Sequence, residues 1–329
     1  MRAVVVREFG GIENAALGDM PKPEPRPGEV LLEIRATAVN FVDLVMMSGN
    51  YQFAPKLPFI PGKLPAGVVA AIGAGVTTLK PGDHTIAMAE QGGFAEFVAI
   101  PAAQCVKLPP ALRFVEAAAM ALIYDTAYFA LHDRARIEAG ETVLVLGATG
   151  GVGLAAIQLA KAFGATVFAG VASRDKEDIV RNAGADAVID LAAADLKGSL
   201  RTQVLAKTGD KGVDIVIDML GGDYFEAAIR ALAWCGRLVV IGFASGRIPS
   251  LKANYLLVKN IEVSGMQISD YRKRRPVDMQ ACFKEIFELH AAGKIAALET
   301  KIYPIADFAR AMTDIRDRKQ RGRVVLSLK

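Results

Sequence analysis

Near the middle of the chain the sequence runs Thr142-Val143-Leu144-Val145-Leu146-Gly147-Ala148-Thr149-Gly150-Gly151-Val152-Gly153 and continues as Leu154-Ala155-Ala156-Ile157-Gln158-Leu159-Ala160-Lys161. An apolar run, a glycine-rich turn and an apolar face at helical spacing predict a buried strand, a tight turn and an amphipathic helix. The glycines permit the tight turn and close approach of a phosphate, and the helix N-terminus adds free N–H groups that attract an anion. We therefore predict a dinucleotide phosphate cradle, with a glycine turn that binds no ligand as the alternative. The cradle residues are Gly147, Thr149, Gly150, Gly151, Val152 and Gly153.

Beyond this stretch, short apolar strands alternate with helical segments. The predicted helices cover 175–182, 196–207 and 224–234. The predicted strands cover 167–171, 187–190, 213–218 and 237–242. Helices between short apolar strands form crossovers, so the strands are parallel and both faces of the sheet are covered. The pattern predicts an α/β fold with a doubly wound parallel sheet.

The two ends of the chain follow a different pattern. Glycine and proline separate short extended segments at 29–38, 67–72, 84–89 and 93–100. This spacing is typical of an antiparallel, partly barrel-like β domain. The tail predicts helices at 279–292 and 305–317 and strands near Lys301 and at 323–326. We expect the tail to rejoin the first domain, which gives one domain of 1–122 and 265–329 and an inserted domain of 123–264.

The composition is that of an enzyme-sized globular protein. With 329 residues, of which 52% are hydrophobic and 22% charged, the chain is long enough for two domains with sizeable cores. The net charge of +4 is small. The basic cluster 272–275 is interpreted as a solvated loop rather than a nucleic-acid site, so we expect no nucleic-acid partner.

Cysteine usage and hydropathy indicate the compartment. Cys105, Cys235 and Cys282 are far apart, which argues against a disulfide framework and fits a reducing environment. The charged N-terminus lacks the apolar segment of a signal peptide. No run approaches the roughly 20 apolar residues of a membrane span. We expect a cytoplasmic protein without a membrane partner.

Motifs along nearly the whole chain resemble those of one known family. They lie at 38–43 (AVNFVD), 48–51 (SGNY), 58–62 (PFIPG), 80–83 (KPGD), 93–96 (GFAE), 126–128 (TAY), 139–141 (AGE), 147–153 (GATGGVG) and 236–239 (GRLV). Their order and spacing are similar to those of the zinc-independent quinone oxidoreductase (zeta-crystallin-like) branch of the medium-chain dehydrogenase/reductases. The resemblance implies a Rossmann domain, a GroES-like β catalytic domain, and NADPH-dependent reduction of quinones or conjugated carbonyls, usually by a homodimer.

The resemblance also bears on metal binding. Zinc-dependent relatives place a cysteine about where Asn40 stands, and a histidine–glutamate pair shortly after the glycine that matches Gly62. Here Lys63 and Leu64 follow that glycine. A structural zinc lobe would need several closely spaced cysteines, and the three histidines of this chain are isolated. We therefore expect no zinc site.

The residues after the second strand bear on the choice of nucleotide. An NAD-binding domain places an acidic residue about 20 residues beyond the glycines, where it accepts hydrogen bonds from the adenosine ribose. Here Ser173, Arg174 and Lys176 offer donors and positive charge, which suit a 2′-phosphate, and a lysine matching Lys176 contacts that phosphate in the resembling family. Asp175 is interpreted as the N-cap of the next helix. Some relatives add a tyrosine where this chain has Leu191, but the pattern favours NADPH over NADH.

Hydride delivery to an enone or quinone without a metal builds negative charge on a distant oxygen, which needs a hydrogen-bond donor or a proton. The resemblance points to Asn40 and Tyr51, which match polar residues of the substrate site in relatives, and Tyr124 is a further catalytic candidate. Asn40 has an alternative as a turn residue after the strand that ends at Val39. Tyr51 has an alternative as an amphipathic residue at the rim.

Further positions are expected to contact the nucleotide. Thr126 resembles a threonine on the nicotinamide side of the cofactor, and the backbone around Gly242 and Phe243 is expected to cover the carboxamide. Arg323 in the last strand is expected either to reach the cofactor or to pair with an acidic residue.

Lys63 departs from the resembling family, which commonly carries an acidic residue in this turn. A lysine in a proline-flanked turn is usually solvated. The alternative is that Lys63 favours an anionic substrate, such as an acrylate or a thioester of a phosphate-bearing carrier.

Taken together, these features predict an NADPH-dependent reductase of a quinone or an α,β-unsaturated carbonyl compound that works by metal-free hydride transfer. An enoyl-thioester (enoyl-CoA or enoyl-ACP) reductase and a non-catalytic NADPH-binding regulator are the alternatives.

Overall fold

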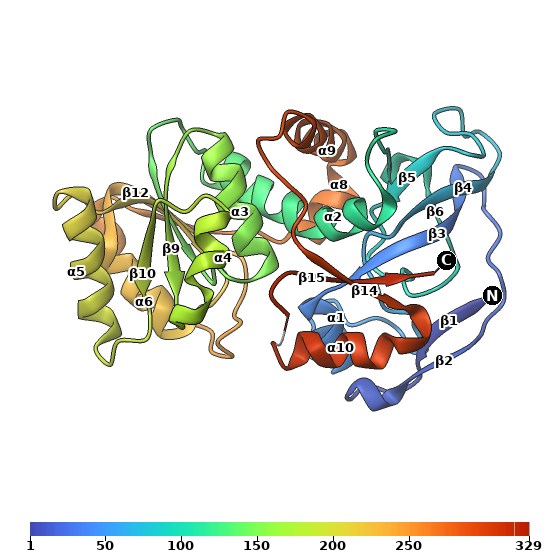
Figure 1. The fold of residues 1–329 in the computed structure, drawn as a ribbon, viewed down its shortest axis with the longest axis horizontal. Coiled ribbons are helices and arrows are strands. Elements are labelled where there is room, and N and C mark those ends of the chain that lie inside the picture. Colours follow the sequence, from blue (N-terminus) through green and yellow to red (C-terminus); the bar gives the residue numbers. More distant parts are fainter. Residues whose placement is uncertain (319, 329) are drawn as a thin grey trace. The chain divides into compact units, whose positions relative to one another are not determined.

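The computed structural model describes residues 1–318 and 320–328, which form two compact units (Figure 1). The first unit contains Met1–Leu122, Ser269–Phe283 and Ala297–Lys329, and the second contains Ile123–Ile268 and Lys284–Ala296. We expected 265–329 to return to the first unit as one piece, whereas the segment 284–296 groups with the second.

The second unit is built on a parallel β-sheet with the strand order β10-β9-β8-β11-β12-β13. The strands are β8 (Thr142–Leu146), β9 (Thr166–Val171), β10 (Ala187–Asp190), β11 (Val213–Asp218), β12 (Leu232–Val240) and β13 (Glu262–Gly265). β9 and β10 follow β8 on one side, while β11, β12 and β13 lie on its other side, so the strand order reverses beside β8. Such a reversal opens a crevice at the carboxyl ends of the strands, where α/β sheets bind ligands. The prediction of a doubly wound parallel sheet is confirmed.

Helices connect these strands and cover the sheet (Figure 1). They are α3 (Gly151–Ala162), α4 (Glu177–Asn182), α5 (Leu196–Thr208), α6 (Gly222–Ala231) and α7 (Asn254–Lys259). Their apolar faces pack on the sheet in a core that includes Leu144, Phe168, Val216 and Phe225. The predicted helix 224–234 ends too late, because Leu232 already pairs with Val213 as the first residue of β12.

The first unit is mainly antiparallel β structure. Its larger sheet has the order β14-β15-β3-β4-β5-β7, with β6 paired to β3, and β1 pairs with β2. The strands are β1 (Arg2–Val6), β2 (Ala15–Asp19), β3 (Glu29–Val39), β4 (Ala66–Ile72), β5 (His84–Ala87), β6 (Phe97–Pro101), β7 (Cys105–Lys107), β14 (Thr300–Pro304) and β15 (Arg323–Ser327). The last strand, β15, pairs antiparallel with the end of β3, with Val324 opposite Val39. The expected GroES-like β domain is confirmed, and this register brings Arg323 next to the residue that follows β3.

Helices and short turns complete the fold. The α-helices not yet named are α1 (Phe41–Met47), α2 (Phe114–Phe129), α8 (Ile268–Arg274), α9 (Pro276–Ala291) and α10 (Phe308–Arg316). The short helical turns are η1 (Ile12–Asn14), η2 (Ala102–Gln104), η3 (Ala130–Arg134), η4 (Arg174–Lys176) and η5 (Ile305–Asp307).

One helical segment, Phe114–Arg134, has the length and apolar composition of a membrane span. It is not an uninterrupted apolar run, because Glu116, Asp125, Asp133 and Arg134 lie within it. In addition, 78% of its most apolar stretch is buried inside the protein, and the core helix of a globular protein has the same composition. The segment is weak evidence for a membrane contact.

Candidate functional site

In the first unit, the pairing of β15 with β3 places Asn40 beside Arg323. The guanidinium of Arg323 donates from Nη2 to Oδ1 of Asn40 at 2.6 Å and from Nε to the carbonyl oxygen of Ala119 at 3.1 Å. The Nδ2 of Asn40 donates to the carbonyl oxygen of Ala38 at 3.2 Å. An amide nitrogen carries two N–H groups, and the Asn40 side chain also hydrogen-bonds the carboxyl of Asp43, which acts to lower the pKa of that carboxyl.

Both of these side chains are buried, with Asn40 3% exposed and Arg323 6% exposed. Burial lowers the pKa of Arg323 to about 10, although the negative charge of Asp43 acts in the opposite direction. Arg323 therefore stays charged at neutral pH. We expected it to reach the cofactor or to pair with an acidic residue, whereas its hydrogen bonds in the structure go to Asn40 and Ala119.

Asp43 connects the end of β3 to the turn that contains Lys63. Its Oδ2 accepts from the backbone N–H of Asn40 at 2.8 Å, and its Oδ1 accepts from the N–H of Gly62 at 3.2 Å. Complete burial raises the pKa of Asp43 to about 6, although these N–H groups and the positive charge of Lys63 act to lower it. Asn40 precedes α1 as its N-cap, which makes it a turn residue. Its side chain is also the hydrogen-bond partner of Arg323.

Lys63 is buried, with 2% of its side chain exposed. Its Nζ donates to Oε2 of Glu90 at 2.5 Å and lies 5.2 Å from the ring centre of Tyr51. The interpretation of Lys63 as a solvated residue is wrong, because the carboxylate of Glu90 offsets the cost of burying the ammonium group.

The helix α8 supplies two further partners of Glu90. Arg272 donates from Nη1 to Oε1 at 2.8 Å, and the hydroxyl of Ser269 donates to Oε2 at 2.5 Å. Arg272 is completely buried, so the interpretation of 272–275 as a solvated loop is wrong for this residue. Burial acts to raise the pKa of Glu90, but the charges of Arg272 and Lys63 outweigh it and hold the pKa at about 2.

This low pKa makes Glu90 an acid-sensitive support of the first unit. A carboxyl group whose pKa is lower in the folded state contributes stability that is present above its unfolded pKa of 4.5 and is lost as the pH falls toward about 2. We expect Glu90→Gln to lower the free energy of unfolding by about 2 kcal/mol at pH 7 and by less at pH 3. Urea unfolding of both proteins at the two pH values measures this difference. An equal loss at pH 7 and pH 3 would contradict the assignment.

Tyr51 is half-buried, and its ring lies 6.1 Å from that of Phe53 in an edge-on arrangement. Lys63 lies on one side of Tyr51, and Asp43 joins the Lys63 turn to Asn40. The first unit thus links Asn40 to Lys63 through the buried carboxylate of Asp43, and Tyr51 lies next to Lys63.

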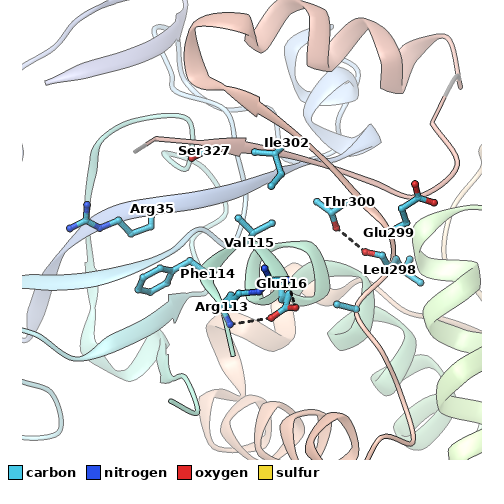
Figure 2. Close-up of a pocket in the computed structure, with 11 residues that line it drawn as sticks. Arg35, Arg113, Phe114, Val115, Glu116, Leu298, Glu299, Thr300, Ile302 and Ser327 are labelled. Carbon is cyan, nitrogen blue, oxygen red and sulfur yellow. Dashed lines mark hydrogen bonds and ion pairs between the residues drawn. The ribbon is translucent and has the colours of Figure 1, made fainter. Parts of the chain in front are cut away.

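A cavity of about 550 Å³ lies elsewhere in the first unit. Figure 2 shows residues that line it. Arg113 and Glu116 form an ion pair of 2.7 Å at its wall, and the hydroxyl of Thr300 donates to the carbonyl oxygen of Leu298 at 2.8 Å. Each of these polar groups therefore has a hydrogen-bond or ion-pair partner in the wall of the cavity. Among the residues that the structure describes, none of the predicted site residues lines this cavity.

In the second unit, the chain between β8 and α3 forms the predicted glycine turn. Gly147 has a φ of +77°, and its carbonyl oxygen accepts from the N–H of Gly150 at 3.1 Å. A Cβ atom on Gly153 would lie 2.3 Å from the carbonyl oxygen of Gly147 and 2.7 Å from Cα of Ala148. A Cβ on Gly150 would lie 3.4 Å from the carbonyl oxygen of Gly147. Close packing of helix on turn therefore requires glycine at 153.

The other predicted cradle residues lie in the same segment. Thr149 lies in the turn, and Gly151 and Val152 begin α3. The N–H groups in the first turn of a helix have no partner within the helix, so they are available to an anion. The local backbone thus fits the pyrophosphate of a dinucleotide.

Asp218 ends β11, the neighbour of β8 in the sheet. Its Oδ1 accepts from the N–H groups of Leu220 at 2.8 Å and Gly221 at 2.9 Å. Its Oδ2 is buried and has no hydrogen-bond partner within residues 1–318 and 320–328. Burial raises the pKa of Asp218 against the effect of the two N–H groups. An orphaned acceptor at the carboxyl end of a central strand fits a ligand that donates a hydrogen bond, such as a ribose hydroxyl.

The predicted segment Gly242–Phe243 follows β12 and lies against the turn after β11. The N–H of Ala244 donates to the carbonyl oxygen of Met219 at 3.0 Å, and the N–H of Ser245 donates to that of Leu220 at 3.0 Å. These bonds hold Phe243, which is 42% exposed, at the same end of the sheet as Asp218.

The predicted 2′-phosphate residues lie in the turn η4 that follows β9. Ser173 and Arg174 are exposed, and Lys176 is half-buried. The hydroxyl of Ser173 donates to Oδ1 of Asp175. The prediction that Asp175 caps the next helix is wrong, because η4 intervenes and Lys176 is the N-cap of α4.

Tyr124 and Thr126 lie on α2 in the second unit and are both buried. The hydroxyl of Tyr124 donates to the carbonyl oxygen of Ala296 at 2.7 Å, and burial raises its pKa. The Oγ1 of Thr126 donates to Oδ1 of Asp125 at 3.3 Å. A phenol held in this way is a poor source of protons for a substrate.

Within residues 1–318 and 320–328, no group of three or more His, Cys, Asp or Glu side chains is arranged to hold a metal ion.

Comparison with known proteins identifies the family. The model described as alcohol dehydrogenase GroES-like domain matches residues 26–110, and that described as zinc-binding dehydrogenase matches residues 151–285. Quinone oxidoreductase-like protein 2 of Bos taurus is 36% identical over 310 residues, which cover 94% of this chain and 87% of the relative. The chain belongs to the quinone oxidoreductase branch of the medium-chain dehydrogenase/reductases. It is an oxidoreductase of that family, as its motifs predicted.

Solved structures agree with this assignment. A mycobacterial protein solved in complex with NADPH has a TM-score of 0.91 and 32% identity to this oxidoreductase, covering 99% of this chain and 100% of that one. The CurK enoyl reductase has a TM-score of 0.87 and 26% identity, covering 99% of this chain and 98% of that one.

Sequence reasoning missed several residues of these clusters. Asp43, Glu90 and Arg272 were assigned no role, and Asp218 was seen only as the end of a strand. The acidic residue three positions after Asn40 was the one available signal, because an N-cap followed at that spacing by a carboxylate is typical of a helix start.

Proposed function

We propose that this protein is an NADPH-dependent reductase of quinones or α,β-unsaturated carbonyl compounds and that it transfers hydride without a metal ion. NADPH supplies the hydride when bound. The observation that carries the proposal is the buried Arg323–Asn40 pair, in which the guanidinium fixes the orientation of the Asn40 amide, a donor group for an acceptor oxygen. The names of the relatives support the reaction class, and the glycine turn of the second unit supports the nucleotide.

The residues of the second unit fit NADPH. The glycine turn accommodates the pyrophosphate, and Asp218 offers its orphaned oxygen to a hydroxyl group of the ligand. Arg174 and Lys176 present positive charge beyond β9, while the carboxylate between them is engaged by Ser173. A 2′-phosphate is recognised by such cations, whereas an unphosphorylated ribose needs an acceptor.

Charge reversal at Arg174 tests this preference. We expect Arg174→Asp to raise KM for NADPH roughly 10-fold or more and to improve the relative use of NADH, because it replaces a cation with a hydroxyl acceptor. Steady-state oxidation of both nucleotides measures the ratio of kcat/KM values. Arg181→Asp on α4, which carries no predicted phosphate contact, is the control. Equal use of NADH and NADPH by the unchanged protein would contradict the assignment.

In the first unit, Asn40 binds the oxygen of the acceptor. Negative charge develops on that oxygen as the acceptor is reduced, so a fixed N–H donor stabilises the transition state more than the ground state. Tyr51 borders the same cluster and covers the acceptor with its ring. Tyr124 has no part in proton transfer in this proposal, because its hydroxyl is held by Ala296.

The chain does not fit a catalytic zinc ion, although one matching family model is described as zinc-binding dehydrogenase. Asn40 and Lys63 stand where the ligands of zinc-dependent relatives are expected, and their side chains are engaged by Arg323 and Glu90. The buried positive charges of Lys63 and Arg323 repel a dication. The reaction is therefore proposed without a metal.

A panel of acceptors tests the proposed function. NADPH oxidation is followed with quinones, enals, acrylates and enoyl thioesters, each with and without protein. Turnover of quinones or enals is the expected result. NADPH binding without turnover of any acceptor would overturn the proposal in favour of a binding protein.

An enoyl-thioester reductase is the second candidate. The likeness to the CurK enoyl reductase favours it, since that structure covers nearly the whole chain. In the same panel, a kcat/KM for enoyl thioesters that exceeds that for every quinone and enal would select this function.

We further propose that the protein is a cytoplasmic homodimer. The strand β13 ends the sheet of the second unit, and apolar side chains are exposed on α7 and on the nearby strand β12. Leu257 is 80% exposed, Val258 74% and Trp234 72%. Exposed apolar groups beside an edge strand are typical of an interface. Sedimentation equilibrium distinguishes a dimer from a monomer.

A further inference from the structure

Lys63 is a buried ammonium group whose hydrogen-bonding capacity is only partly used. An ammonium group carries three N–H donors. Within residues 1–318 and 320–328, the Nζ of Lys63 donates a hydrogen bond to Oε2 of Glu90 at 2.5 Å. Only 2% of the side chain is exposed, so solvent does not fully satisfy the other donors. The ammonium group of Lys63 can therefore donate a further hydrogen bond to the oxygen of a bound molecule.

The unused donors lie in the cluster assigned to the acceptor. The Nζ of Lys63 is 5.2 Å from the ring centre of Tyr51. The turn that carries Lys63 is joined to Asn40 through Asp43, which accepts hydrogen bonds from Gly62 and from Asn40. Lys63 and Asn40 thus approach the same carboxylate from two elements of the first unit.

The surroundings of Glu90 allow Lys63 to release a proton. Arg272 and Ser269 donate to Glu90 independently of Lys63, so its carboxylate keeps two partners when Lys63 is neutral. Glu90 is itself a poor acid, since its pKa is held at about 2. Asn40 has no acidic proton, and both oxygens of Asp43 already accept from backbone N–H groups. Arg323 also contacts Asn40, but its guanidinium is engaged by Asn40 and by the carbonyl oxygen of Ala119. The ammonium group near Tyr51 and Asp43 is that of Lys63.

We propose that Lys63 is the general acid of the reductase and binds the acceptor oxygen together with Asn40. This inference rests on the proposed function. The acceptor gains a hydride, with two electrons, at one end of its conjugated system, and the electron pair displaced by the new C–H bond moves to the oxygen at the other end. That oxygen takes a proton from Nζ of Lys63, which becomes a neutral amine and is protonated again from solvent. NADPH is oxidised to NADP⁺ as the acceptor is reduced by two electrons.

The first test is turnover by Lys63→Met, which keeps the length and apolar stem of the side chain. We expect kcat to fall about 100-fold, which is typical of the loss of a general acid. Lys107→Met is the matched control, because Lys107 pairs with Asp83 at 2.9 Å but is 55% exposed and outside the cluster. It should leave kcat unchanged. Thermal unfolding of both variants checks that the Lys63→Met fold is retained by the remaining partners of Glu90.

The second test reports the charge at the oxygen site without turnover. 4-Nitrophenol resembles the reduced acceptor in offering one ionisable oxygen, and its anion is coloured. Titration of the complex with the unchanged protein, with NADP⁺ present, should show ionisation at a pH lower by about 1 unit than in solution, since a nearby ammonium group favours the anion. Lys63→Met should abolish this shift, whereas Lys107→Met should keep it.

The outcomes separate this inference from the proposed function. Normal kcat and an unchanged nitrophenol shift in Lys63→Met would overturn the role of Lys63 while leaving the reductase intact. If the unchanged protein reduces no acceptor of the panel, the proposed function fails, and the nitrophenol titration still decides whether Lys63 faces a bound oxygen. Lys63→Arg, which keeps the charge but is a far weaker acid, should retain the shift and lose turnover.

Discussion

Gly153→Ala is expected to weaken NADPH binding by about 100-fold and to destabilise the second unit by about 1–3 kcal/mol. The added Cβ would lie 2.3 Å from the carbonyl oxygen of Gly147 and 2.7 Å from Cα of Ala148. Both are backbone atoms, so no side-chain rotation relieves the contact. The turn or the start of α3 must shift, and the N–H groups that we propose to bind the pyrophosphate shift with it.

Fluorescence titration with NADPH and thermal unfolding measure the two effects. Gly150→Ala is the matched control, because Gly150 has a φ of −82° and its added Cβ would lie 3.4 Å from the carbonyl oxygen of Gly147. We expect this variant to unfold like the unchanged protein. Unaltered affinity and stability in Gly153→Ala would show that the helix does not need its close approach to the turn.

Arg323→Met is expected to lower kcat by about 100-fold to 1,000-fold and to lower the stability of the first unit by about 3–5 kcal/mol. Arg323 fixes the amide of Asn40 through the bond of 2.6 Å to Oδ1. Without it the amide is free to turn, and Asp43 is left completely buried with less positive charge nearby. The loss of a fixed donor affects the transition state more than substrate binding, so KM should change less than kcat.

Asn40→Asp separates the two roles of this pair. An aspartate at 40 still accepts from Arg323 and keeps the shape of asparagine, but its ionised side chain has no N–H donor. We expect it to retain the fold and to lose turnover to a similar extent. Steady-state kinetics and urea unfolding of both variants distinguish the roles. Near-normal kcat in Asn40→Asp would show that the amide does not bind the acceptor oxygen.

These expectations describe a division of labour between the two units. In the second unit, we propose that backbone geometry carries nucleotide binding, which a single added methyl group is expected to disturb. In the first unit, we propose that buried charges carry the chemistry: Arg323 is held by Asn40 and Ala119, and Lys63 is held by Glu90. Buried charges of this kind are costly unless they are paired, and the remaining donors suit charge that develops only during reaction.

Much of the fold of the second unit was predictable from local sequence. The predicted strands 187–190 and 213–218 coincide with β10 and β11, because short apolar runs bounded by polar or glycine residues read clearly as buried parallel strands. Four helices were missed in the two units, namely α1, α2, α7 and α8. The helix α2 is apolar on nearly every face and so lacks the helical periodicity on which the prediction rests. The helix α1 is a short segment that begins directly after a strand.

The candidate site was predicted in part. The glycine turn, Asn40 and Tyr51 each lie in a short local motif, so they could be recognised from adjacent residues. Glu90 and Arg272 are 182 residues apart, and nothing local marks either as the partner of the other. Arg323 was singled out, but its partner Asn40, 283 residues away, was not.

The sequence by itself determined the parallel sheet, the glycine turn and the family to which this oxidoreductase belongs, because each depends on residue types at short, fixed spacings. Only the tertiary structure decided which charges are buried and what each of them contacts. Lys63 and Arg272 read as solvated cations in sequence, yet both are buried against Glu90. The reason is physical: the ionisation and orientation of a side chain depend on distances and solvent exclusion, which arise only when distant segments pack together.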